Sequence, residues 1–139
     1  MIILDTNIFS ELMKTTPDET VLKWFDRLPP QPVATTAITV AELYYGLASL
    51  PKGKRRDGLK KALQMTLTDD LGGLVLPFGE AAAEIYGYLA ARLQKTGTPI
   101  GQSDTMIAAI ILQHGGLLVT RNIKHFKHCK IDVVNPFES

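Results

Sequence analysis

The sequence predicts an α/β domain built on a mainly parallel sheet. Helical patterns or short turns separate successive strand-like runs, and this alternation is typical of strand–helix–strand units. A chain of 139 residues is usual for one domain, so we expect a single domain over residues 1–139. The five strand-like runs, each short and mostly apolar, are Ile2–Asp5, Val33–Thr36, Leu74–Pro77, Leu117–Thr120 and Asp132–Asn135.

Between these runs, apolar residues recur at the spacing of helices. The first predicted helix start, Thr16-Pro17-Asp18-Glu19, combines a capping residue, a proline at the first helical position and early acids. The Pro51-Lys52-Gly53 turn separates two helical segments that we expect to form a hairpin. The predicted helices cover about residues 16–28, 39–50, 54–71 and 82–93, and a last helix from residue 101 to the stop at Gly115-Gly116.

The composition is that of a globular protein outside the membrane. Hydrophobic residues make up 45% and charged residues 21%, and no apolar run reaches the roughly 18 residues of a membrane span. The chain begins Met-Ile-Ile-Leu-Asp without a basic, apolar leader, and Cys129 is its only cysteine. We therefore expect a soluble, cytoplasmic protein without an internal disulfide.

Three acidic residues far apart in the sequence are predicted to share one edge of the sheet, which we call the acidic edge. Asp5 closes the first strand, Glu42 lies in the first turn of the helix after the second strand, and Asp104 begins the apolar helix before the fourth. In a parallel α/β sheet, strand C-termini and helix N-termini lie on the side where ligands bind. We expect the three carboxylates to point to one site.

Each acid also has a structural interpretation. Asp5 could cap a turn, Glu42 could complete a capping box that starts at Thr39, and Asp104 could complement a helix dipole after a Ser103 cap. Together, however, three carboxylates repel one another unless a cation holds them. Oxygen ligands favour a hard ion, so the sequence predicts Mg²⁺, with Mn²⁺ as a substitute, and phosphoryl chemistry.

Two other clusters are candidates for binding. His125, His128 and Cys129 form an H-x-x-H-C group, but no fourth ligand at a zinc-like interval accompanies it. The net charge of +1 does not point to nucleic acid, so only local clustering can. Cations concentrate in a segment that is either a solvated helix face or a phosphate-binding patch: Lys52, Lys54, Arg55, Arg56, Lys60 and Lys61.

Four motifs occur together in order along the chain. They are Ile3-Leu4-Asp5-Thr6-Asn7, Ile38-Thr39-Val40-Ala41-Glu42-Leu43, Asp104 with Ile107-Ala108-Ala109, and Leu118-Val119-Thr120-Arg121-Asn122. With these motifs, and with Asn135-Pro136-Phe137 near its end, the chain resembles the PIN-domain ribonucleases over essentially its whole length. Within them it is similar to the VapC-type toxins of bacterial toxin–antitoxin pairs, in the FitB-like group.

The resemblance implies a three-layer α/β/α fold with five parallel strands in the order 3-2-1-4-5. It also implies a homodimer, a cognate antitoxin, DNA contacts made only through that antitoxin, and metal-dependent cleavage of RNA, with transfer RNA among the candidate substrates. Asp5 and Asp104 would be the main metal ligands and Glu42 the third acid. Thr6 and Thr120 would orient carboxylates or water, and Asn7 would brace the loop.

One departure from the family pattern concerns the metal. Many relatives have a fourth acid shortly after the last threonine, where this chain has Asn122 and then His125. An amide brings no negative charge, so we expect one metal ion, or a second that arrives with the RNA. Lys52, Lys54, Arg55 and Arg56 are expected to help hold the RNA backbone.

Two other functions remain open at this point. The first is a non-catalytic module that binds nucleic acid or a partner and acts with an antitoxin in operon autoregulation, which the missing fourth acid favours. The second is a haloacid-dehalogenase-like phosphatase. Its nucleophilic aspartate normally has a second aspartate two residues later, and this chain has Asn7 there.

Overall fold

The computed structural model describes residues 1–138 and contains one parallel five-stranded sheet. The strand order is β3-β2-β1-β4-β5, as the family resemblance predicted. The central strand β1 pairs with β2 on one side, where Ile3 lies opposite Ala34, and with β4 on the other, where Ile3 lies opposite Leu118. The strands are β1 (Ile2–Leu4), β2 (Val33–Thr36), β3 (Val75–Leu76), β4 (Leu117–Val119) and β5 (Asp132–Val134).

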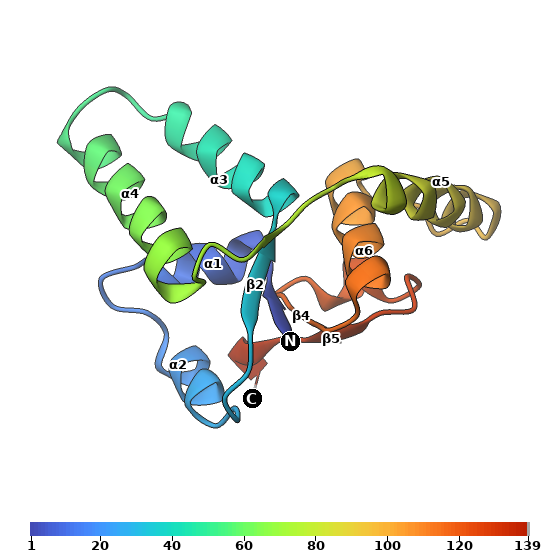
Figure 1. The fold of residues 1–139 in the computed structure, drawn as a ribbon, viewed down its shortest axis with the longest axis horizontal. Coiled ribbons are helices and arrows are strands. Elements are labelled where there is room, and N and C mark those ends of the chain that lie inside the picture. Colours follow the sequence, from blue (N-terminus) through green and yellow to red (C-terminus); the bar gives the residue numbers. More distant parts are fainter. Residues whose placement is uncertain (139) are drawn as a thin grey trace.

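Helices cover both faces of the sheet and make the fold three-layered (Figure 1). The α-helices are α1 (Thr6–Leu12), α2 (Glu19–Asp26), α3 (Ala37–Ala48), α4 (Lys54–Met65), α5 (Glu80–Lys95) and α6 (Gln102–His114). Short turns of helix follow at η1 (Thr66–Asp70), η2 (Ile123–Phe126) and η3 (Pro136–Glu138). The α/β architecture predicted from the alternation of patterns is thereby confirmed.

Side chains alternate across the sheet and divide the core into two clusters. Ile3 and Leu118 face the layer of α5 and α6, where they pack with Leu93, Ile110 and other buried residues. Ile2 and Leu4 face the opposite layer, with residues of α1 and α4. Because every second residue of a strand points to the same face, a three-residue strand can serve both clusters.

The structure differs from the sequence-based expectation at three helices. Thr6–Leu12 is helical, where only a turn or cap was expected. Helix α3 begins at Ala37 rather than near Thr39, because the Thr36 hydroxyl accepts a hydrogen bond from the Thr39 amide at 3.1 Å and caps the helix there. The helix expected to run to Leu71 ends at Met65 and continues as the π-helical turn η1.

No helix within residues 1–138 combines the length and the hydropathy needed to cross a membrane.

Candidate functional site

Asp5 is fixed by the loop that follows the central strand. Its carboxylate caps α1, because Oδ1 accepts a hydrogen bond from the Thr6 amide at 2.8 Å. Oδ2 accepts a second bond from the Thr120 hydroxyl at 2.6 Å, and the Asp5 amide donates to the carbonyl of Val119 at 3.0 Å. Asp5 is buried, and both of its carboxylate oxygens accept hydrogen bonds from residues that come just after β1 and β4.

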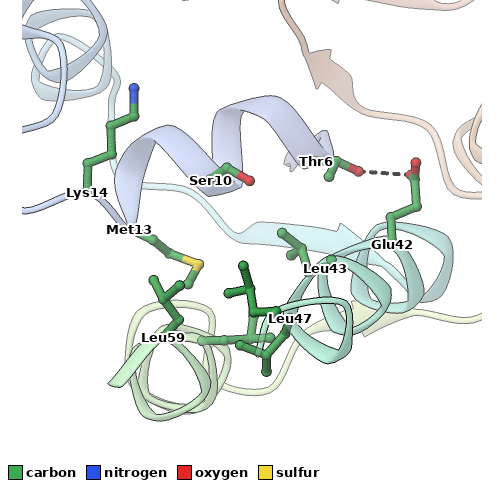
Figure 2. A pocket seen from close by; sticks show the side chains of 11 residues that line it. Thr6, Ser10, Met13, Lys14, Glu42, Leu43, Leu47 and Leu59 are labelled. Atoms are coloured by element: carbon green, nitrogen blue, oxygen red, sulfur yellow. Dashed lines mark hydrogen bonds between the residues drawn. The ribbon is translucent and has the colours of Figure 1, made fainter. Parts of the chain in front are cut away.

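Glu42 reaches the same edge from α3. Because α3 begins at Ala37, Glu42 lies in its second turn and not in its first, and the capping box from Thr39 does not form. Its Oε1 instead accepts a hydrogen bond from the Thr6 hydroxyl at 2.9 Å (Figure 2). Thr6 therefore connects two of the predicted site residues, since its amide binds Asp5 and its hydroxyl binds Glu42.

Asp104 lies in the first turn of α6, as the sequence predicted. The cap position of α6 is Gly101, so Ser103 is not the cap. Oδ2 of Asp104 is 2.9 Å from Nδ1 of His125. Sequence reasoning considered His125 for a zinc site and noted it after Asn122, where relatives have a fourth acid, but missed this contact with Asp104.

Two of the three carboxylates have raised pKa values, and neighbouring acids contribute to both shifts. Burial raises the pKa of Asp5, and the charge of Asp104 raises it further, against the hydrogen bonds from Thr120 and Thr6 and the nearby His125. Partial burial also raises the pKa of Glu42; the Thr6 hydroxyl lowers it, and the charges of Asp5 and Asp104 raise it. The fold therefore gathers like charges at the acidic edge.

The acidic edge has the donor chemistry of a metal site but is not a preformed cage. Within residues 1–138, no three histidine, cysteine, aspartate or glutamate side chains converge closely enough to hold a metal ion as they stand. Over the same residues, ion pairs join Lys14 to Glu11 and His125 to Asp104, so no lysine or arginine neutralises the edge. Oxygen ligands with uncompensated charge fit a hard divalent ion, provided that side-chain rotation draws them together.

Side-chain oxygens accept backbone amides of the loop after β4, and one of them ties that loop to α1. Oδ1 of Asn7 accepts from the Arg121 amide at 2.9 Å, and the Asn122 amide donates to the Thr120 hydroxyl at 3.1 Å. Asn122 makes its hydrogen bonds through its backbone in the described part of the chain, and its side-chain amide contacts no carboxylate there.

Comparison with known proteins identifies the family. The PIN domain model matches residues 2–131, which is nearly the whole chain. The chain belongs to the PIN-domain family.

This PIN domain is similar over its full length to named toxins and ribonucleases. It is 42% identical over 138 residues to the VapC ribonuclease Y4jK of Sinorhizobium fredii, with 99% of each chain covered. It is 37% identical over 137 residues to the toxin FitB of Neisseria gonorrhoeae, again with 99% of each chain covered. The predicted likeness to VapC-type and FitB-like proteins is confirmed.

Solved structures of toxin–antitoxin complexes contain the same PIN fold. The crystal structure of FitAcB from Neisseria gonorrhoeae matches with a TM-score of 0.89 and 37% identity over 100% of both chains. The structure of VapBC2 from Rickettsia felis bound to a promoter DNA fragment matches with a TM-score of 0.79 and 29% identity, covering 97% of this chain and 98% of that one.

The cations predicted to bind RNA lie away from the acidic edge of this PIN domain. The basic turn, which we define as Lys52, Lys54, Arg55 and Arg56, comprises one residue of the connection after α3 and the first three residues of α4, at the tip of the helical hairpin (Figure 1). Glu42 lies midway along α3, and at 1.5 Å per residue about 9 Å of helix axis separates it from Ala48 at the hairpin end of that helix. The three predicted acids interact electrostatically at the acidic edge, and the basic turn lies at the far end of the hairpin from them.

The H-x-x-H-C group does not form a metal site in this PIN domain. Cys129 is buried in the core, and His128 is exposed with its carbonyl accepting a bond from Arg92. His125 turns toward Asp104 instead.

An apolar groove runs from the acidic edge along the helices of one layer (Figure 2). It has a volume of about 390 Å³ and is bounded by α1, α3 and α4. Thr6 and Glu42 form its end at the acidic edge, and Lys14 lies on its wall. Its apolar lining is made by Met13, Leu43, Leu47, Leu50, Leu59 and Leu63.

Proposed function

We propose that this PIN domain is the toxin of a toxin–antitoxin pair and that it hydrolyses RNA phosphodiester bonds as a metal-dependent endoribonuclease. The observation that carries the proposal is the acidic edge, where Asp5, Glu42 and Asp104 come from three distant segments and the charge of Asp104 raises the pKa of both Asp5 and Glu42. Relatives named VapC ribonuclease and FitB toxin, similar along the whole chain, support the same activity.

Asp5, Glu42 and Asp104 are the residues that would hold Mg²⁺, with Mn²⁺ as a substitute. When bound, such an ion supplies a Lewis acid that activates water and stabilises charge on the leaving oxygen of a phosphodiester. Thr120 and the Thr6 amide orient Asp5, and the Thr6 hydroxyl orients Glu42. Asn122 adds no negative charge, which favours one ion, or a second recruited with the RNA.

Asn7 braces the two loops that carry these groups. Its side chain accepts from the Arg121 amide, and its Nδ2 lies 3.5 Å from Oδ2 of Asp5. The spacing between the end of β1 and the end of β4 is therefore fixed by a side chain as well as by the sheet. A fixed loop geometry helps catalysis because the reacting groups need little reorganisation.

The substrate and partner surfaces follow from charge and shape. We propose that the basic turn holds the RNA backbone outside the acidic edge, with transfer RNA among the candidate substrates. The apolar groove suits a segment of the cognate antitoxin, which would cover the acidic edge by binding at Thr6 and Glu42. We further propose that the protein is a cytoplasmic homodimer that binds DNA only through the antitoxin. A solved structure of the relative VapBC2 is bound to a DNA fragment.

Replacing single acids by amides tests the proposed activity. Asp5→Asn and Asp104→Asn should each abolish Mg²⁺-dependent cleavage of RNA and retain the wild-type circular dichroism spectrum. The fold should survive in Asp5→Asn because the amide oxygen can still accept from Thr6 while Thr120 accepts from the amide nitrogen. Asp69→Asn, an exposed acid outside the edge, is the control and should cleave normally. Full activity in either edge variant would refute the mechanism.

One observation favours the alternative of a non-catalytic module that acts with an antitoxin in operon autoregulation. In residues 1–138 no three ligand side chains are assembled for a metal ion. The wild-type chain decides between the two functions. If it cleaves no RNA and does not inhibit growth when produced without an antitoxin, yet binds that antitoxin, the non-catalytic function is correct.

A further inference from the structure

We infer that His125 is a positioning residue for Asp104, and that its imidazole keeps this carboxylate directed to the acidic edge for the metal ion. The inference rests on the proposed function, because it assigns a role within the same site. In this arrangement a histidine that follows β4 supports Asp104 of α6. The histidine lies three residues after Asn122, the uncharged residue found where many relatives have an acid.

The contact between the two side chains determines where the imidazole proton lies. Nδ1 of His125 is 2.9 Å from Oδ2 of Asp104. An ionised carboxylate can only accept hydrogen bonds, so Nδ1 carries a proton and donates the hydrogen bond to Oδ2. The contact uses Oδ2 and leaves the other carboxylate oxygen of Asp104 available to a cation.

The imidazole is presented by a segment that is anchored in the core. His125 belongs to η2, and the next residue, Phe126, is buried between the sheet and α6. The His125 amide donates to the carbonyl of Asn122 at 3.0 Å, and the Cys129 amide donates to that of Phe126 at 3.1 Å. Although the ring itself is 54% exposed, its backbone is held on both sides, so the donor has a defined position.

A single loop thereby organises two of the three acids. Thr120, at the start of the loop, donates to Asp5 at 2.6 Å, and His125, five residues later, binds Asp104. The imidazole also interacts electrostatically with Asp5 itself. In the absence of a cation, the other carboxylates repel Asp104, and a fixed donor opposes that repulsion. Hydrogen-bonded partners of ligating carboxylates commonly contribute to metal affinity for this reason.

Binding of Mn²⁺ alone, measured by titration calorimetry on the full chain, tests the inference without relying on catalysis. His125→Ala should weaken Mn²⁺ binding by about tenfold, the usual effect of removing a partner of a metal ligand. His125→Asn should bind almost as tightly as the wild type, because the asparagine Nδ2 occupies the position of the imidazole Nδ1 and is also a donor. His128→Ala removes an exposed imidazole three residues away and should leave the affinity unchanged.

The pair of His125 variants separates positioning from direct ligation. If His125 were itself a ligand through Nε2, asparagine would lack the ligating atom and His125→Asn would bind as weakly as His125→Ala. Equal loss in both variants, or wild-type affinity in His125→Ala, overturns the inference. Either of these results would leave the proposed function standing, provided that Asp5→Asn abolishes Mn²⁺ binding and RNA cleavage. A wild-type chain that binds no Mn²⁺ overturns both.

A second measurement uses the metal-free wild-type protein and needs no variant to fold. A long-range ¹H–¹⁵N spectrum of the imidazole nitrogens should assign the proton of His125 to Nδ1, with His128 in the same spectrum as the internal reference. An Nε2-protonated ring with a bare Nδ1 would contradict donation to Asp104 and overturn the inference.

Discussion

Two buried carboxylates of this protein have opposite electrostatic environments. Glu11 is held by the Lys14 ammonium at 2.9 Å and the Asp18 amide at 3.0 Å, and these partners lower its pKa. Asp5 has hydrogen bonds but, within residues 1–138, no lysine or arginine partner, and burial raises its pKa. The difference separates a carboxylate that stabilises the fold from one that remains available to a cation.

The pH dependence of stability tests the structural role of Glu11. Glu11→Gln should lower the free energy of unfolding by about 1 kcal/mol at pH 7, because a charge-assisted bond is removed while Lys14 remains partly solvated. Since the folded pKa is depressed, the contribution of the carboxylate is present above the ordinary pKa of 4.5 and is lost as the pH falls through the folded value.

Urea unfolding of both proteins at pH 7 and pH 3 measures this difference. The gap between wild type and Glu11→Gln should shrink at pH 3. Glu84→Gln, an exposed residue of α5, is the control and should match the wild type at both pH values. A gap that is the same at both pH values would contradict the assignment.

The residues of the site were predictable from the sequence only as far as their backbone positions. Strand ends and helix starts place Asp5 and Asp104 at one edge whatever their rotamers, so these positions follow from the pattern. The contact of His125 depends on the path of a short 3₁₀ turn, which has no periodic signal. Asn7 likewise looks like a turn residue until Arg121 is placed beside it.

At the scale of elements, the start of α3 and the short helix α1 were the hardest to predict from the sequence. Thr36 and Thr39 are both good capping residues and three positions apart, and only the end of β2 decides that Thr36 caps α3. The short helix α1 was missed because seven residues carry too little periodicity to identify. The longer helices and all five strands were identified because burial imposes a clear pattern on them.

Gly116 at the entry to β4 should tolerate no side chain. Its φ is +101°, and a Cβ there would lie 2.9 Å from the carbonyl oxygen of Met1 and 3.3 Å from Ile3. Gly116→Ala should lower the free energy of unfolding by about 1–3 kcal/mol, because both the backbone conformation and the close approach are unfavourable.

Gly58 provides the matched comparison for this substitution. It lies in α4, and an added Cβ would meet no atom within 4 Å. Gly58→Ala should therefore raise the free energy of unfolding by about 0.5–1 kcal/mol in the same urea experiment. Equal effects of the two alanines would refute the close approach between β1 and the turn before β4.

Over the whole molecule, charge is distributed unevenly although the net charge is only +1. The acidic edge lies where the strands end, and the basic turn lies at the tip of the α3–α4 hairpin (Figure 1). A phosphate chain that contacts both would have to extend along α3. Net charge alone could not have predicted this arrangement, because it depends on where the hairpin points.

The salt dependence of RNA binding tests the basic turn. In an Asp5→Asn background, which should not cleave, the triple variant Lys54→Gln, Arg55→Gln, Arg56→Gln should bind RNA more weakly. The plot of log affinity against log salt has a negative slope, and its magnitude should decrease by about 2, because each single-strand phosphate that is no longer neutralised removes about 0.7. The control removes the same charge elsewhere, at Lys23, Lys95 and Lys130. If both triple variants change the slope equally, the basic turn has no special role.

The bond between Thr120 and Asp5 joins residues that are 115 positions apart, since the first strand of the chain lies in the middle of the sheet. A ribosome adds Asp5 115 residues before Thr120, so the nascent chain has the first carboxylate of the acidic edge long before the hydroxyl that holds it. Until Asp104 and Thr120 have been translated, the nascent chain of the proposed toxin cannot assemble the acidic edge.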